Sequence, residues 1–126
     1  MHTPEGLHYS TDHEWVRVEG DTAVLGITDY AQDALGDVVY VDLPQPGDAV
    51  TAGGTFGEVE STKSVSELYA PVSGTIASVN DELADEPEKV NTDPYGEGWI
   101  CKVTLRDRGE LESLLDAAAY QALIEG

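Results

Sequence analysis

Lys63 is the residue whose type and position most favour chemistry in this chain. It lies between two strand-like runs within residues 55–71, so the pattern places Thr62 and Lys63 at the turn of a β-hairpin. An amine at such a turn is sterically open, and a second protein can reach it. It is also one of only three lysines in a chain with 25 acidic residues. The position suits a lysine that another enzyme acylates, although on local pattern alone a turn lysine is usually a plain surface residue.

Other residues with catalytic or metal-binding potential do not form a recognisable pattern. The histidines His2, His8 and His13 all precede the first long strand, and with no Cys partner or His-x-x-His spacing they do not predict a zinc site. No serine stands in a Gly-x-Ser-x-Gly elbow. The acidic segment 81–97 lacks the ligand spacing of a calcium loop. We therefore expect no metal site and no independent enzymatic activity.

Composition narrows the class of protein. The chain has 126 residues, the size of one domain spanning 1–126, and a net charge of −19. Such a charge repels nucleic acid and anionic membrane surfaces. No apolar run reaches the roughly 18 residues of a membrane span, and the N-terminus lacks the pattern of a secretory signal. Cys101 is the only cysteine, so no intrachain disulfide can form, and we expect a cytoplasmic protein with Cys101 in its core.

The acidity itself has two interpretations that the sequence leaves open. It could steer partners that have basic docking surfaces, or it could keep the protein soluble at high salt, where the self-repulsion is screened. In either case the repulsion between copies predicts a monomer at low salt.

The elements that must position Lys63 are mostly short strands separated by Gly, Pro, Asn and Asp. Residues 14–18 and 22–27 form a hairpin pattern, and Thr28 or Asp29 is expected to cap a short helix that ends at Leu35 and Gly36. The β-branched run 37–43 predicts a central strand. Further along the chain we expect a strand at 74–80, a short helix near 81–86, an irregular loop to 98 and a strand at 99–105.

Two Pro-x-x-Gly corners, 44–47 and 71–74, flank β-branched runs and hint at two similar halves. Near the C-terminus, apolar residues recur at helical steps and predict one face that packs on the β core: Leu111, Leu114, Leu115, Ala118, Ala119, Ala122 and Leu123. Trp15 and Trp99 are expected in or near the core. We therefore expect a mainly β fold, a flattened barrel or β-sandwich with a few short helices and a C-terminal helix.

The segment around Lys63 resembles the lipoyl-lysine region of the H protein of the glycine cleavage system. The likeness extends over nearly the whole chain, in the expected order: His13-Glu14-Trp15-Val16, Gly26-Ile27-Thr28-Asp29-Tyr30-Ala31-Gln32, Leu35-Gly36-Asp37-Val38-Val39, Gly57 to Gly74 and Asp93-Pro94-Tyr95-Gly96. Departures are mild: Thr62, Ser64 and Glu67 stand where Val, Ala and Asp are more usual.

The resemblance implies a non-catalytic carrier of the lipoyl/biotinyl-carrier type, with lipoate in amide linkage to Lys63. It implies partners: a lipoylating enzyme, the P protein (glycine decarboxylase), the T protein (aminomethyltransferase) and the L protein (dihydrolipoyl dehydrogenase). The carrier would take the aminomethyl group of glycine from the P protein to the T protein and electrons to the L protein. Because the loaded arm ends in an ammonium, we expect carboxylates to hold it, and we assign this role to Glu14, Glu67 and Asp12.

Two related functions remain as alternatives. An H-like protein could relay lipoate to other enzymes without serving glycine cleavage. A biotin carrier shares the fold and the hairpin lysine, but such domains flank the lysine with methionines, and the only methionine here is Met1.

Overall fold

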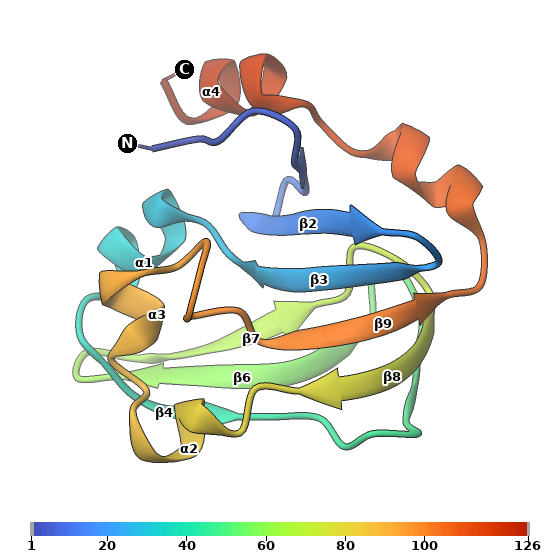
Figure 1. Ribbon diagram of the computed structural model, residues 1–126. Coiled ribbons are helices and arrows are strands. Elements are labelled where there is room, and N and C mark those ends of the chain that lie inside the picture. Colours follow the sequence, from blue (N-terminus) through green and yellow to red (C-terminus); the bar gives the residue numbers. More distant parts are fainter. Residues whose placement is uncertain (1, 126) are drawn as a thin grey trace.

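The computed structural model describes residues 2–125, which form two antiparallel β-sheets (Figure 1). The larger sheet has the strand order β1-β2-β3-β9-β8-β5, and the smaller has the order β4-β6-β7. The strands are β1 (His8–Tyr9), β2 (Glu14–Glu19), β3 (Thr22–Ile27), β4 (Val38–Asp42), β5 (Ala49–Val50), β6 (Thr55–Ser61), β7 (Val65–Tyr69), β8 (Gly74–Val79) and β9 (Cys101–Leu105). The helices are α1 (Asp29–Leu35), α2 (Glu82–Asp85), α3 (Lys89–Thr92), the 3₁₀ helix η1 (Arg108–Ser113) and α4 (Ala117–Glu125). The expected mainly β fold with short helices and a C-terminal helix is confirmed.

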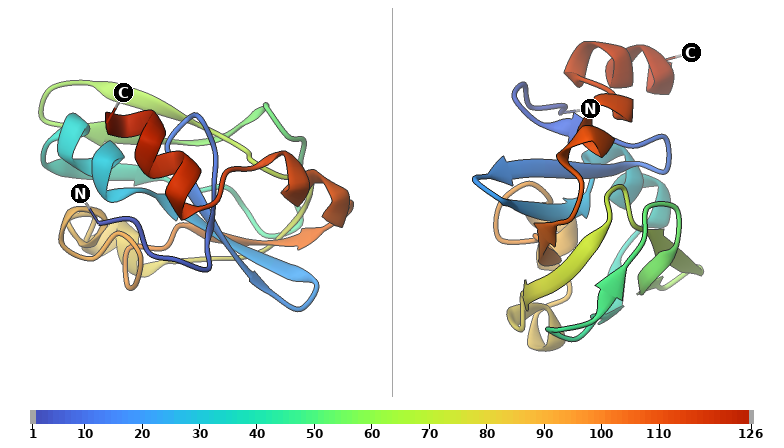
Figure 2. Two further views of the ribbon diagram at one scale, coloured as in Figure 1. Left: turned by 90° about the horizontal axis from the view of Figure 1, so that it is seen from above. Right: turned by 90° about the vertical axis from the view of Figure 1, so that its right-hand side faces the viewer.

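In the six-stranded sheet, strands β2 and β3 have buried residues on both faces. Along β2 and β3, alternate residues enter different clusters: Val16 and Leu25 join the main core between the sheets. Trp15 and Val24 face the other way and pack with Tyr9 and Tyr120 under α4. Figure 2 shows α4 lying over this sheet, beside the N-terminal segment. The C-terminal helix therefore closes a second, smaller core.

The hairpin and helix that precede the smaller sheet follow the sequence closely. The expected hairpin is β2 paired with β3. Thr28 caps α1, because its side-chain oxygen accepts a hydrogen bond from the Ala31 N–H at 3.2 Å. Gly36 ends the helix at φ 85°, a left-handed conformation that favours glycine.

The expectation of a central strand at 37–43 is wrong in position. β4 pairs only with β6 and forms an edge of the smaller sheet. A bulge between Val38 and Tyr40 turns two neighbouring side chains outward, leaving Val39 50% and Tyr40 53% exposed. β-branched composition does not distinguish an edge from a centre, because that depends on which strands come from elsewhere in the chain.

The expected single apolar helical face at the C-terminus is also wrong. η1 ends at Ser113, its C-cap Leu114 has an extended backbone, and Leu115 exchanges backbone hydrogen bonds with Tyr9. This break changes the register, so α4 turns Ala117, Tyr120 and Ile124 toward the second core. Four residues of the expected face are exposed: Ala118, Ala119, Ala122 and Leu123.

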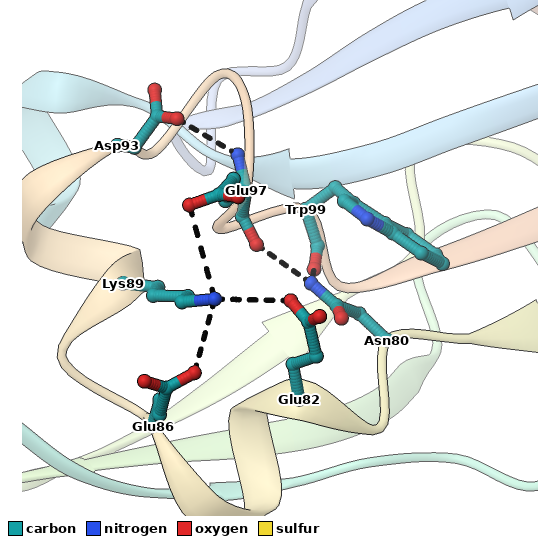
Figure 3. A network of polar contacts seen from close by, with 7 residues as sticks. All are labelled: Asn80, Glu82, Glu86, Lys89, Asp93, Glu97 and Trp99. Atoms are coloured by element: carbon teal, nitrogen blue, oxygen red, sulfur yellow. Dashed lines mark hydrogen bonds and ion pairs between the residues drawn. The ribbon is translucent and has the colours of Figure 1, made fainter.

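The acidic segment 81–98 is more regular than expected. The short helix near 81–86 is confirmed as α2, but α3 stands where the sequence suggested irregular loop. The Lys89 ammonium lies 3.0 Å from Glu82, 3.0 Å from Glu86 and 3.8 Å from Glu97 (Figure 3). The Asn80 side chain donates to the backbone oxygens of Glu97 and Trp99. One lysine thus forms ion pairs with three acids that the sequence alone presents as repulsive.

Three smaller expectations concern burial. Trp15 is fully buried, Trp99 is half-buried against the second core, and Cys101 is a buried free cysteine, all as expected. Across residues 2–125, no helix is long and apolar enough to cross a membrane.

Candidate functional site

Lys63 lies at the tip of the β6–β7 hairpin, as expected. The turn spans residues 61–64 and is closed by the Ser61 N–H, which donates to the Ser64 carbonyl at 2.8 Å. The Ser61 hydroxyl oxygen accepts hydrogen bonds from the Lys63 and Ser64 N–H groups at 3.2 and 3.1 Å. The Thr62 N–H donates to the Asp37 carbonyl, which ties the tip to the residue before β4. The lysine is therefore presented by a fixed backbone.

The Lys63 side chain is exposed and lies beside Gly36, the residue that ends α1. A Cβ built on Gly36 would lie 3.0 Å from Lys63 Cε, so glycine leaves the space in which the side chain lies. Within residues 2–125, the Lys63 ammonium makes no ion pair. It is open to a modifying enzyme.

A cleft of about 190 Å³ begins beside α1, and we call it the α1 cleft. One side is α1 itself, with Tyr30, Ala31, Ala34 and Leu35; the opposite sides are residues 12–14 and residues 66–68 of β7. Ile27 completes the lining. Ala31 and Ala34 are three residues apart on one face of α1, and their small side chains leave space along that face. The cleft therefore runs along α1, from the end near Lys63 toward residues 12–14.

The structure brings Asp12, Glu14 and Glu67 together, because all three line the α1 cleft. They come from distant parts of the chain: two precede or begin β2, and Glu67 lies on β7. Asp12 and Glu67 are exposed, and Glu67 Oε2 accepts a hydrogen bond from the Tyr69 hydroxyl at 3.1 Å. Within residues 2–125, no group of three or more His, Cys, Asp or Glu side chains is arranged to hold a metal ion.

Glu14 differs from the other two carboxyl groups because it is only 2% exposed. Its Oε2 accepts a hydrogen bond from the Tyr69 N–H at 2.8 Å, and its Oε1 accepts one from the Ser10 hydroxyl at 3.2 Å. Burial raises the pKa of Glu14 to about 8, against the opposing effect of these hydrogen bonds. A buried carboxyl poised near neutral pH in a cleft is a functional-site candidate on physical grounds.

Sequence reasoning missed the walls of the cleft. Tyr30, Ala31, Ala34 and Leu35 were assigned only to a short helix, and His13 only to a histidine-bearing N-terminal segment. The helical spacing of Ala31, Ala34 and Leu35 was a usable signal for one shared face. Nothing in the sequence says that β7 faces this helix.

Comparisons with known proteins agree over nearly the full length. The family model described as glycine cleavage H-protein matches residues 7–126. The chain is 62% identical over 119 residues to the glycine cleavage system H protein of Micrococcus luteus, covering 93% of each. It is 57% identical to the probable glycine cleavage system H protein of Haloarcula marismortui, covering 97% of this chain and 96% of the relative. The crystal structure of a glycine cleavage system H protein from Mycobacterium marinum superposes with a TM-score of 0.89 at 44% identity, covering 98% of this chain and 99% of that chain.

A two-sheet β fold that presents an exposed lysine on a rigid hairpin, beside an acid-ended cleft, defines a carrier-type domain. The chain belongs to the glycine cleavage H-protein family, whose members are lipoate-binding carriers.

Proposed function

We propose that this single-domain protein carries lipoate in amide linkage on Lys63 and transfers the aminomethyl group of glycine from the P protein to the T protein. The observation that carries the proposal is the α1 cleft, which reaches Leu35, next to the Gly36 beside which the Lys63 side chain lies, and is lined by three carboxyl groups. The bound group would supply a cyclic disulfide that accepts the aminomethyl group at the P protein, is left as a dithiol at the T protein and is reoxidised by the L protein. The residues of this chain would bind the arm, orient it and shield the aminomethyl group that it carries.

The cleft fits an extended, mostly apolar arm with a cationic end. α1 has seven residues, so its face offers a path about 10 Å long between Gly36 and the residues before β2. The low Ala31 and Ala34 face and the Leu35, Ile27 and Leu68 side chains suit an aliphatic chain. The carboxyl groups of Asp12, Glu14 and Glu67 suit an ammonium at its end.

Glu14 has a specific part in this proposal. With the cleft empty, its raised pKa of about 8 leaves most of the carboxyl protonated at neutral pH. An ammonium in the cleft favours the ionised form, because an opposite charge nearby lowers a carboxyl pKa. Binding of the amine is therefore expected to release part of a proton. The resulting ion pair would hold the aminomethyl group while the carrier moves between enzymes.

Partner recognition follows from charge and exposure. The outer face of β6 and β7 carries exposed Glu58, Glu60 and Glu67 next to the Lys63 turn, and within residues 2–125 none of them forms an ion pair. We propose that the lipoylating enzyme and the three partner enzymes meet this side with basic surfaces. The same repulsion favours a monomeric carrier.

Mass spectrometry of the native protein tests the attachment. We expect a lipoyl adduct on Lys63, and none on the Lys63→Arg variant, which keeps the charge but not the acylation site. A biotinyl adduct, or lipoate at another lysine, would contradict the proposal. Glycine–bicarbonate exchange with the P protein then separates glycine cleavage from a lipoate relay, since a pure relay would not support exchange.

The carboxyl assignment is tested by the rate at which isolated, loaded carrier loses its aminomethyl group. Glu14→Gln and Glu67→Gln should both speed the loss, with Glu14→Gln having the larger effect because Glu14 is buried. Glu60→Gln is the matched control, since Glu60 is exposed on β6 and does not line the cleft. Equal rates for all three variants and the wild type would refute the assignment.

A further inference from the structure

The buried hydroxyl group of Tyr120 lies between two segments that form opposite sides of the α1 cleft. Tyr120 is on α4, is fully buried and stacks on Tyr9 with ring centroids 4.7 Å apart and planes inclined by 8°. Its hydroxyl oxygen is 2.7 Å from Thr28 Oγ1 and 2.9 Å from His13 Nδ1. One hydroxyl therefore contacts two residues from separate segments of the chain, one before β2 and one before α1.

One of these two residues caps the helix that forms one wall of the cleft, and the other belongs to the opposite wall. Thr28 is the N-cap of α1, whose residues Tyr30, Ala31, Ala34 and Leu35 form the helical wall. His13 lies between Asp12 and Glu14, and all three line the opposite wall. The Thr28 N–H also donates to the His13 carbonyl at 3.1 Å. Tyr120 thus adds a side-chain link to a backbone link between the two walls.

Counting donors and acceptors fixes the direction of the hydrogen bonds. The Thr28 hydroxyl is fully buried and already accepts from the Ala31 N–H, so its own proton requires an acceptor. The Tyr120 oxygen is the acceptor available, and the Tyr120 proton then goes to His13 Nδ1. His13 is therefore neutral and carries its proton on Nε2. The reverse direction would leave the Thr28 proton without a partner among residues 2–125.

The backbone of His13 shows why this support matters. Its φ is 67°, in the left-handed region that only a few per cent of non-glycine residues adopt, with Asn, Asp and His the most frequent among them. The His13 N–H donates to the Ser10 carbonyl at 3.1 Å, and the ring lies against Tyr30 at 4.7 Å. This conformation sets the direction in which the neighbouring Asp12 and Glu14 leave the chain. Holding the His13 ring in place therefore helps to hold both carboxyl groups.

We propose that Tyr120 is a positioning residue for the α1 cleft: its hydroxyl fixes the neutral His13 ring and links residues 12–14 to the cap of α1. The C-terminal helix would then determine how well the cleft retains the aminomethyl group. The retention part of this inference rests on the proposed function, whereas the hydrogen-bond link does not.

The first experiment uses the unmodified protein and nitrogen NMR of its histidines. Wild type should show His13 with its proton on Nε2, and Tyr120→Phe should give a mixture of tautomers. The pKa of His13, which burial lowers, should rise in Tyr120→Phe, because the neutral ring loses the hydrogen bond that it accepts. The ionisable groups around this ring are Asp12 and Glu14 on its own segment, Tyr30, Tyr120 and, across the cleft, Glu67. None of these except Tyr120 changes in the variant.

Tyr9→Phe is the matched control, because Tyr9 belongs to the same stacked pair but its hydroxyl donates to the Pro4 carbonyl. It should leave the His13 tautomer unchanged. An unchanged tautomer and pKa in Tyr120→Phe, or the same change in Tyr9→Phe, would overturn the link.

The second experiment measures loss of the aminomethyl group from the loaded carrier. Tyr120→Phe should speed the loss roughly three- to ten-fold, as expected when one buried hydrogen bond is removed, while Tyr9→Phe stays near wild type. His13→Asn should have a similar effect, since Asn tolerates the left-handed backbone but cannot reach Tyr120 in the same way. The double variant should lose the aminomethyl group no faster than the faster single variant, because each single variant already removes the same Tyr120–His13 interaction.

Additive effects in the double variant, or equal acceleration by Tyr9→Phe, would overturn the positioning role. A wild-type cleft that loses the aminomethyl group as fast as a lipoyl-lysine peptide would contradict the proposed function instead. In that case the tautomer measurement alone would support or overturn the hydrogen-bond link.

Discussion

Replacing Glu14 by Gln should stabilise the protein, and by an amount that grows with pH. Glu14 is 2% exposed, and burial raises its pKa from 4.5 to about 8 in the folded protein. Between these two values the folded state binds more protons than the unfolded state, so wild-type stability falls as pH rises through this window. Gln keeps the size and the acceptor oxygen of the protonated carboxyl but cannot ionise. The variant is therefore relieved of the cost of burying a charge.

The size of the effect follows from the difference between the two pKa values, about 8 minus 4.5, or about 3.5. At about 1.4 kcal/mol for each pH unit, the advantage of Glu14→Gln should be about 1 kcal/mol at pH 5, about 3 at pH 7 and about 5 at pH 9. Gln also brings an NH₂ group that needs an acceptor, and we expect this to reduce the stability advantage by the same amount at every pH. The decisive quantity is therefore the increase of the advantage with pH.

Urea unfolding of wild type and Glu14→Gln at pH 5, 7 and 9, at fixed ionic strength, measures this slope. Glu60→Gln serves as the control for loss of one negative charge at an exposed site. If the difference between Glu14→Gln and wild type were the same at all three pH values, Glu14 would not be a buried ionisable group, and its proposed role in holding an ammonium would lose its physical basis.

Three further predictions concern the surroundings of the site. Ala34→Phe should fill the α1 cleft and speed loss of the aminomethyl group without preventing lipoylation, whereas Ala84→Phe, exposed on α2, should do neither. Gly36→Ala should lower the free energy of unfolding by about 1–2 kcal/mol from its φ of 85°, and should also slow lipoylation by displacing the lysine side chain. Gly20→Ala is the control for backbone strain, because Gly20 has a φ of 65° and no atom within 4 Å of an added Cβ. Equal lipoylation rates in the Gly36→Ala and Gly20→Ala variants would refute the contact between residue 36 and Lys63. Lys89→Met should make unfolding more salt-dependent, because three carboxylates lose their shared cation; unchanged salt dependence would contradict this.

Local features of the molecule could be predicted because their causes lie within a few residues. The Lys63 turn, the β2–β3 hairpin, the Thr28 cap and the Gly36 stop follow from side-chain chemistry and alternation over short windows. The resemblance predicts that Lys63 is the acylation site, and the cationic end expected of the loaded arm predicts a role for Glu14, Glu67 and Asp12. Their placement around one cleft agrees with that proposal, which the decay experiments test.

Features that depend on distant segments could not be predicted in the same way. The sequence predicted a central position for β4 and a single apolar face for the C-terminal helix, and both predictions were wrong. Each feature depends on which segments lie alongside in the fold. Lys89 is another example, since its three carboxylates become neighbours only when α2, α3 and the loop at Glu97 meet.

A lysine on a hairpin in a strongly acidic β protein follows from the amino-acid sequence alone. The burial of Glu14, the cleft between α1 and β7, and the position of Tyr120 between its walls arise only from the packed fold. The physical reason is that burial, and with it the pKa of a carboxyl group and the direction of a hydrogen bond, is a property of the surroundings. Those surroundings come from segments far apart in the chain.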